Sequence, residues 1–115
     1  MSAFNKAIPM IVTDRVVRLA ELGVPWVHRR RFVGCAIMGP PPALLSGCYI
    51  QGSRWLGVSE SSFVIVDDPT NPANLPGGTI SFVECTFDKC EFINFTAVGS
   101  HEQIDALKAL FPLAG

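Results

Sequence analysis

Four cysteines and two histidines are the residues of this 115-residue sequence with the most obvious capacity for metal or redox chemistry. Structural zinc sites usually draw their ligands from close pairs such as C-x2-C. The nearest two cysteines here, Cys85 and Cys90, are five positions apart, with Phe87 between them. We therefore predict neither a metal site nor any other cofactor.

The state of the cysteines depends on the compartment in which the chain folds. The segment from Met1 to Met10 lacks the continuous apolar stretch of a signal peptide. No run approaches the ~20 apolar residues that a membrane-spanning helix needs. We expect a cytoplasmic chain with reduced thiols, no disulfides and no membrane association.

No group of reactive side chains forms a complete catalytic set. Cys35 follows the basic run at 28–31, but burial in an apolar strand is the favoured interpretation of this thiol. Asp67 and Asp68 are adjacent at the end of an expected strand, where neighbouring side chains point to opposite faces, so a turn is favoured. No G-x-G-x-x-G or P-loop motif is present. We predict no catalytic residue, and a carbohydrate-active hydrolase or lyase using these carboxylates or His28 is the remotest alternative.

The sequence HRRR at 28–31 is the best candidate for a ligand site, because clustered basic groups attract phosphate or acidic partners. An exposed strand edge or ion pairs between subunits would also explain it. The candidate ligand-binding residues are His28, Arg29, Arg31 and Trp55.

Charge is distributed unevenly along the chain. Residues 1–31 carry six basic and two acidic side chains, whereas residues 32–115 carry three basic and eight acidic ones. The formal net charge of −1 is low for a polyanion binder, so we favour self-association over nucleic-acid binding. Hydrophobic residues make up 49% of the chain, and this excess indicates a regular core, a subunit interface, or both.

Short β-segments punctuated by Gly and Pro are expected from Trp26 to Gly99. β-branched residues in 11–24 favour strand over a short helix there. The segment 67–78 holds three prolines and two glycines and is predicted to be a loop. The expected strands are 26–28, 31–38, 43–50, 62–66, 79–87 and 90–97.

Each cysteine is followed, two positions later, by a bulky apolar residue on the same expected strand face. Free cysteine behaves as a small buried hydrophobe, so both members of each pair should point inward. The sequence CTFDKCEFIN at 85–94 also resets every five residues, which a strictly alternating strand would not do. The predicted core residues are Cys35, Ile37, Cys48, Ile50, Phe82, Cys85, Phe87, Cys90, Phe92 and Phe95.

The units CAIMG, CYIQG, CTFDK and CEFIN resemble the repeat of pentapeptide-repeat proteins, small right-handed β-helix proteins of bacteria. In that family a small residue and a large apolar residue two positions later both face the interior. The resemblance is direct over about 30 residues, and Pro-rich segments at 39–42 and 69–76 interrupt it. It implies a short parallel β-helix, and it implies no particular function.

The segment 100–111 is predicted to be an amphipathic helix that covers one end of the β-helix. Ser100 and Gln103 form a capping box, and Ile104, Leu107 and Phe111 share one face. We predict an all-β single domain over 1–115, a short right-handed parallel β-helix with this C-terminal capping helix. Residues 1–25 would be an N-terminal lead-in or cap and 26–99 the β-rungs. A small antiparallel β-sandwich or barrel is the alternative.

Three functions remain open from the sequence. The favoured one is a non-enzymatic structural or protein-interaction module that acts as a homo-oligomer. The second is a protein that binds a small ligand or an anion in an intersubunit pocket near the basic run 28–31. The enzyme mentioned above is the third.

Overall fold

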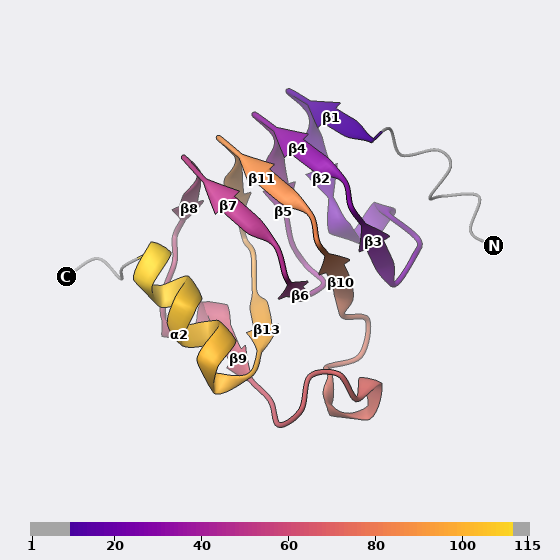
Figure 1. Ribbon diagram of the computed structural model, residues 1–115, viewed down its shortest axis with the longest axis vertical. Helices are drawn as coiled ribbons and strands as arrows, with labels where there is room; N and C mark the ends of the chain where they lie inside the picture. Colours follow the sequence, from indigo (N-terminus) through magenta and orange to yellow (C-terminus); the bar gives the residue numbers. More distant parts are fainter. Residues whose placement is uncertain (1–9, 112–115) are drawn as a thin grey trace.

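Residues 10–111 are described by a computed structural model and form thirteen short strands, three 3-10 turns and one α-helix (Figure 1). The turns are η1 (Leu19–Glu21), η2 (Glu60–Ser62) and η3 (Pro72–Asn74), and the helix is α2 (His101–Leu110). The strands are β1 (Ile11–Thr13), β2 (Val16–Arg18), β3 (Trp26–His28), β4 (Arg31–Val33), β5 (Ala36–Met38), β6 (Ala43–Ser46), β7 (Tyr49–Gln51), β8 (Arg54–Leu56), β9 (Phe63–Ile65), β10 (Ile80–Val83), β11 (Thr86–Asp88), β12 (Glu91–Ile93) and β13 (Ala97–Gly99).

The strands assemble into three sheets, and all ten strand pairings within residues 10–111 are parallel. Sheet A has the order β1-β4-β11-β7, sheet B the order β2-β5-β12-β8, and sheet C the order β3-β10-β6-β13-β9. The chain visits A, B and C in turn along β1 to β9. It then follows C, A, B and C along β10 to β13. The antiparallel sandwich or barrel is therefore the wrong alternative for the described residues.

The last four strands are inserted between strands that precede them in the sequence. β10 lies between β3 and β6, β11 between β4 and β7, β12 between β5 and β8, and β13 between β6 and β9. The loop at 66–79 carries the chain from β9 back to the start of this insertion (Figure 1). Within each sheet, late strands therefore lie between early ones, and the strands do not follow their order in the sequence.

Two-residue corners separate most consecutive strands. The first corner residue has a positive φ, and such residues recur every five positions, at 29 and 34, at 47, 52 and 57, and at 84, 89 and 94. Glycine adopts this conformation without steric cost, and asparagine tolerates it. Three strand residues and two corner residues thus make one five-residue unit, which explains the period seen in the sequence.

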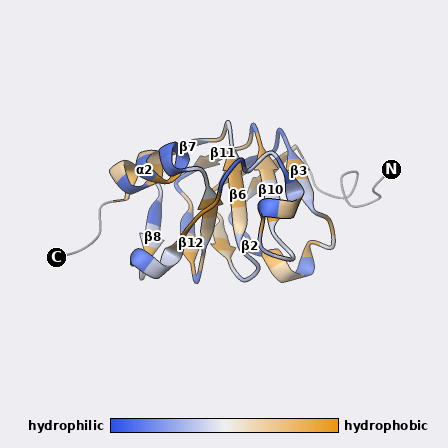
Figure 2. Cartoon of the chain, turned by 90° about the horizontal axis from the view of Figure 1, so that it is seen from below, coloured by the Kyte–Doolittle hydropathy of each residue, from blue (hydrophilic) through white to orange (hydrophobic). Residues whose placement is uncertain are grey.

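Aromatic rings form the centre of the core. Phe32 and Phe87 lie in register on sheet A and stack with their centroids 5.2 Å apart. Phe87 contacts Phe92 at 5.4 Å, and Phe92 contacts Phe95 at 4.8 Å. The ring of Trp55 lies 5.3 Å from that of Phe95 and extends the aromatic contacts toward α2. Figure 2 shows the apolar strands enclosed between more polar corners and loops.

The predicted core residues lie in this core or against it. Eight are at most 2% exposed, whereas Cys48 and Ile50 are half-buried because they flank and belong to β7, the edge strand of sheet A. The buried eight are Cys35, Ile37, Phe82, Cys85, Phe87, Cys90, Phe92 and Phe95.

Helix α2 packs on β13 and β9 at the end of the stack opposite to β1 (Figures 1 and 2). The predicted capping box is formed, since Gln103 N–H donates to Ser100 Oγ at 3.2 Å and Ser100 N–H donates to Gln103 Oε1 at 2.8 Å. Ile104, Leu107 and Phe111 are all buried. The Phe111 ring contacts two core aromatic rings at 5.4 and 5.9 Å, so it closes the core at this end.

Several predicted strand boundaries were wrong. The segments 31–38, 43–50, 79–87 and 90–97 are each divided by a corner into two strands of different sheets. The strand β8 was not predicted. The lead-in extends only to residue 10 at most, because β1 and β2 already belong to sheets A and B, and residues 1–9 lie outside the described part of the chain. The loop at 67–78 contains only the turn η3.

Candidate functional site

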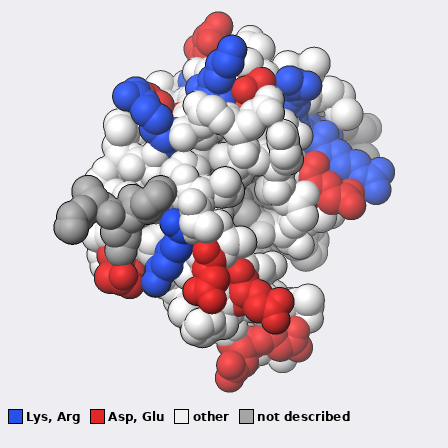
Figure 3. Space-filling view, turned by 60° about the vertical axis from the view of Figure 1, so that its left-hand side comes forward, with Lys and Arg blue, Asp and Glu red and all other residues white. Residues whose placement is uncertain are grey.

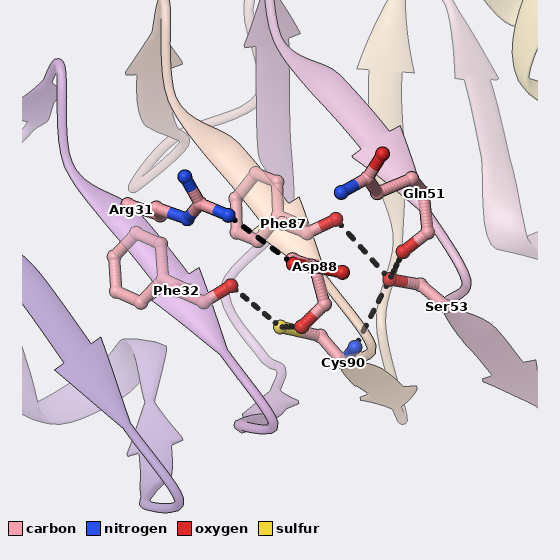
Figure 4. Close-up of polar contacts among 7 residues, drawn as sticks. All are labelled: Arg31, Phe32, Gln51, Ser53, Phe87, Asp88 and Cys90. Carbon is pink, nitrogen blue, oxygen red and sulfur yellow. Dashed lines mark hydrogen bonds and ion pairs between the residues drawn. The ribbon is translucent and has the colours of Figure 1, made fainter.

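The four cysteines and Ser53, all at the second position of a corner, form hydrogen-bonded columns along the stack. Each of these five side chains donates to a backbone carbonyl of an adjacent strand, as Figure 4 shows for Cys90 and Ser53. Cys35, Cys90 and Ser53 form one column, with acceptors 3.3 Å away on Val12, Phe32 and Phe87. Cys85 and Cys48 belong to the second column and donate at 3.4 and 3.2 Å to Val27 and Phe82.

These columns assign the cysteines a structural role. A thiol fills the apolar corner and also satisfies a carbonyl, and the hydroxyl of Ser53 provides the same donor. Burial raises the pKa of the Cys90 thiol, which keeps it protonated and able to donate. No group of three or more His, Cys, Asp or Glu side chains within residues 10–111 is arranged to hold a metal ion.

The basic run does not converge on one site. Arg29 Nε donates to Glu84 Oε1 at 2.8 Å across the corner between sheets C and A. Arg31 pairs with Asp88 at 3.3 Å on the outer face of sheet A, next to the column in Figure 4. Both guanidinium groups are thus engaged with carboxylates of the inserted segment 80–99. Exposed surface ion pairs of this kind contribute little stability.

Trp55 lies in the core, which corrects our prediction that it lines a ligand site. It is 7% exposed, and its ring contacts those of Phe63, Phe95 and Phe111 at 5.1 to 5.4 Å. The flanking residues of β8 face outward, so alternation along this short strand directs the indole inward.

His28 lines a groove of about 420 Å³ between the outer face of sheet C and the Pro-rich loop. Trp26 of the same strand is 56% exposed and forms one wall. The remaining lining residues are mostly apolar or small: Leu44, Ser46, Pro69, Thr70, Pro72, Leu75, Ser81, Val83 and Gln103. Of the four predicted ligand-binding residues, only His28 belongs to this groove.

Asp67 and Asp68 are exposed and serve the loop that follows β9. The Asp68 carboxylate accepts hydrogen bonds from the Thr70 backbone N–H and hydroxyl group, and Asp68 has a φ of 40°. The Asn74 side chain donates to the carbonyl of Asp67 at 2.6 Å. These contacts agree with the turn interpretation of the acidic pair.

Exposed large apolar side chains lie at both ends of the stack: Tyr49, Leu56, Ile65 and Leu110 at the end with β7, β8, β9 and α2, and a second set at the end formed by β1, β2 and β3. We call Met10, Ile11, Val16 and Trp26 the N-terminal end surface; each is between 55% and 62% exposed. The three strands are edge strands of sheets A, B and C, so each pairs on only one side within the described residues. The sequence did not predict this surface. Ile11, Val16 and Trp26 are the first residues of their strands, and buried strands of this chain often begin with an apolar residue as well.

The two ends of the stack differ in the charges that they expose. Exposed Asp14, Arg15, Arg18 and Glu21 lie near the N-terminal end surface and carry both signs. The exposed carboxylates of η2, the loop and α2 lie toward the opposite end, and Figure 3 shows acidic side chains gathered over the lower part of that side.

Residues 10–111 contain no helix of sufficient length and apolarity to cross a membrane. Comparisons with family models, curated proteins and solved structures gave no match.

Proposed function

We propose that this chain is a non-enzymatic structural or protein-interaction module that acts as a homodimer. Its three parallel sheets would be the faces of a short right-handed β-helix of the pentapeptide-repeat type, located in the cytoplasm. The observation that carries the proposal is the N-terminal end surface, where three sheet edges and four exposed apolar side chains coincide.

Unpaired strand edges readily pair with another chain unless charge or a covering element blocks them. Exposed apolar residues at the rim add a favourable contribution when a partner covers them. The charges near this end favour a second copy as that partner. Arg15 and Arg18 form no ion pair within residues 10–111, and Asp14 and Glu21 offer the opposite charge on the same end.

The two ends of the stack differ, and this difference favours a closed dimer over a filament. At the far end Phe111 fills the core opening, α2 packs on the last strands, and Lys108 pairs with Glu60 at 3.2 Å. An isologous contact uses the same surface on both copies and stops at two.

Substitutions at the two ends test this assignment. The change Val16→Glu places a charge on the N-terminal end surface, and Ile65→Glu is the matched control on β9, where Ile65 is 48% exposed. Light scattering after size exclusion should show a dimer for the unmodified chain and for I65E, and a monomer for V16E. A V16E dimer, or dissociation of I65E instead, would refute the assignment. Circular dichroism verifies that both variants are folded.

The groove beside Trp26 and His28 supports a second candidate, the binding of a small, flat and largely apolar ligand. Pockets of this type are concave and mainly apolar, with a few polar groups that orient the ligand. Indole is a suitable probe and should raise the melting temperature. The change Ser46→Phe, which fills the groove, should abolish the rise, while Ser61→Phe outside it should not. No rise with the unmodified chain would exclude this class of ligand.

A further inference from the structure

Two cysteine pairs are stacked at the corners of the coil, each joining an early strand to the inserted segment. In sheet A, β7 and β11 lie side by side (Figure 1). Tyr49 is in register with Thr86, so the preceding residues Cys48 and Cys85 are neighbours. The Tyr49 N–H donates to the Cys85 carbonyl at 2.9 Å, which fixes this register up to the corner. In sheet B, the pairing of Ala36 with Glu91 makes Cys35 and Cys90 neighbours in the same way.

In-register neighbours have the separation that a disulfide requires. Adjacent strands lie about 4.8 Å apart, and cysteines joined by a disulfide have Cα atoms about 4.4–6.8 Å apart. The two thiols of each pair also point in the same direction along the stack, because each donates to a carbonyl of the neighbouring row.

The two pairs differ in their access to solvent. Cys35 and Cys90 are both 1% exposed, and Ser53 covers Cys90 on its outer side, since Ser53 Oγ accepts from the Cys90 N–H at 3.0 Å. Cys85 is equally buried, but Cys48 is half-buried and lies beside the edge strand of sheet A. A small oxidant can therefore reach the Cys48–Cys85 pair and not the other.

We propose that Cys48 and Cys85 are a thiol oxidation site, at which a peroxide converts the pair into an intramolecular disulfide between β7 and β11. The closeness of the two thiols in adjacent strands supports this reactivity. Interaction with the neighbouring thiol lowers the pKa of Cys85 to about 7 and, together with burial, raises the pKa of Cys48. The two sulfurs therefore share a proton, and the pair holds a thiolate at neutral pH more readily than an isolated buried thiol does.

The reaction balances with hydrogen peroxide as the oxidant. The Cys85 sulfur, as thiolate while Cys48 holds the shared proton, attacks one oxygen of a peroxide that enters beside half-buried Cys48. The O–O bond breaks, and a sulfenic acid and hydroxide form. The Cys48 sulfur then attacks the sulfenic sulfur of Cys85, the S–S bond forms, and the S–O bond breaks as water leaves. The two cysteines lose two electrons and two protons, and one peroxide becomes two waters.

Peptide mapping distinguishes the two pairs. Cleavage after Arg31, Arg54 and Lys89 places Cys35 and Cys48 in peptide 32–54, Cys85 in 55–89 and Cys90 in a third peptide. Folded protein is treated with hydrogen peroxide, its remaining thiols are alkylated, and it is digested without reductant. We expect a mass loss of two hydrogens per chain, a linked 32–54/55–89 product, and a single-chain band on a non-reducing gel.

Variants assign the link to its residues. Cys48→Ser should abolish it, and serine fits this position because Ser53 occupies the equivalent place in the other column. Cys35→Ser, the matched control, should retain it. A link from 32–54 to the peptide with Cys90, a link between two chains, oxygen addition at Cys48 with Cys85 still alkylated, or four unreacted thiols would each overturn the proposal. Peptide mapping of the unmodified chain tests the proposal on its own, so the test does not depend on whether the variants fold.

Discussion

The backbone of Gly39 passes so close to Asn94 that a β-carbon on residue 39 would lie 2.3 Å from the Asn94 carbonyl oxygen. Two hydrogen bonds join Gly39 to the segment 93–94: Gly39 N–H donates to Ile93 O at 3.1 Å, and Asn94 Nδ2 donates to Gly39 O at 3.3 Å. Gly39 lies between β5 and β6, where the chain steps past the inserted segment. The inserted segment can therefore pack this closely against the chain between β5 and β6 only if residue 39 is glycine.

The change Gly39→Ala should therefore lower the free energy of unfolding by about 1–3 kcal/mol, the usual cost of overpacking. The clash is with backbone, which cannot rotate away. Urea unfolding measures the effect. Gly77→Ala is the control, since a β-carbon there has no neighbour within 4 Å. If both variants were equally stable, the backbones of residues 39 and 94 would not be in close contact.

Phe111 should contribute strongly to stability although it follows the last helical residue. Its ring contacts Trp55 at 5.4 Å and Phe92 at 5.9 Å in the core. Phe111→Ala should cost about 3–5 kcal/mol, with a red shift of Trp55 fluorescence as water reaches the indole.

Leu110→Ala provides the comparison for this prediction, because Leu110 is 56% exposed. It should change the free energy of unfolding by less than about 0.5 kcal/mol. Equal losses for both variants would mean that α2 does not close the core through Phe111.

Ser53 should be required for the column of hydrogen bonds at its corner. It donates to Phe87 O at 3.3 Å and accepts from the Cys90 N–H at 3.0 Å. Ser53→Ala leaves that buried N–H without its acceptor and should cost about 1–3 kcal/mol. Hydrogen exchange gives a direct measure: the Cys90 amide should exchange faster, whereas that of Glu91, bonded to Cys35 O, should be unchanged. Unaltered exchange at Cys90 would contradict this role.

Local features of this fold were predictable from the sequence. The capping box of Ser100 and Gln103 depends on residues three positions apart, and the helix formed as expected. The five-residue period of CTFDKCEFIN reflects a corner followed by a three-residue strand, so the inward side chains Phe87 and Phe92 were correctly identified.

The order of the strands within each sheet could not be predicted, because it depends on contacts between residues that are far apart in the sequence. Phe32, Phe87 and Ile50 are equivalent inward residues of sheet A, and each would pack acceptably beside either of the others. No local pattern distinguishes the observed order from a sequential one. Trp55 was misplaced because its strand β8 was not predicted, so no inward position was assigned to the indole.

The molecular mass in solution tests the proposed homodimer most directly. The unmodified chain, reduced and at several concentrations, is measured by light scattering coupled to size exclusion. A dimer joined through the N-terminal end surface predicts twice the mass of the 12.4-kDa chain, with dissociation only on dilution. A mass of one chain at every concentration would contradict the account.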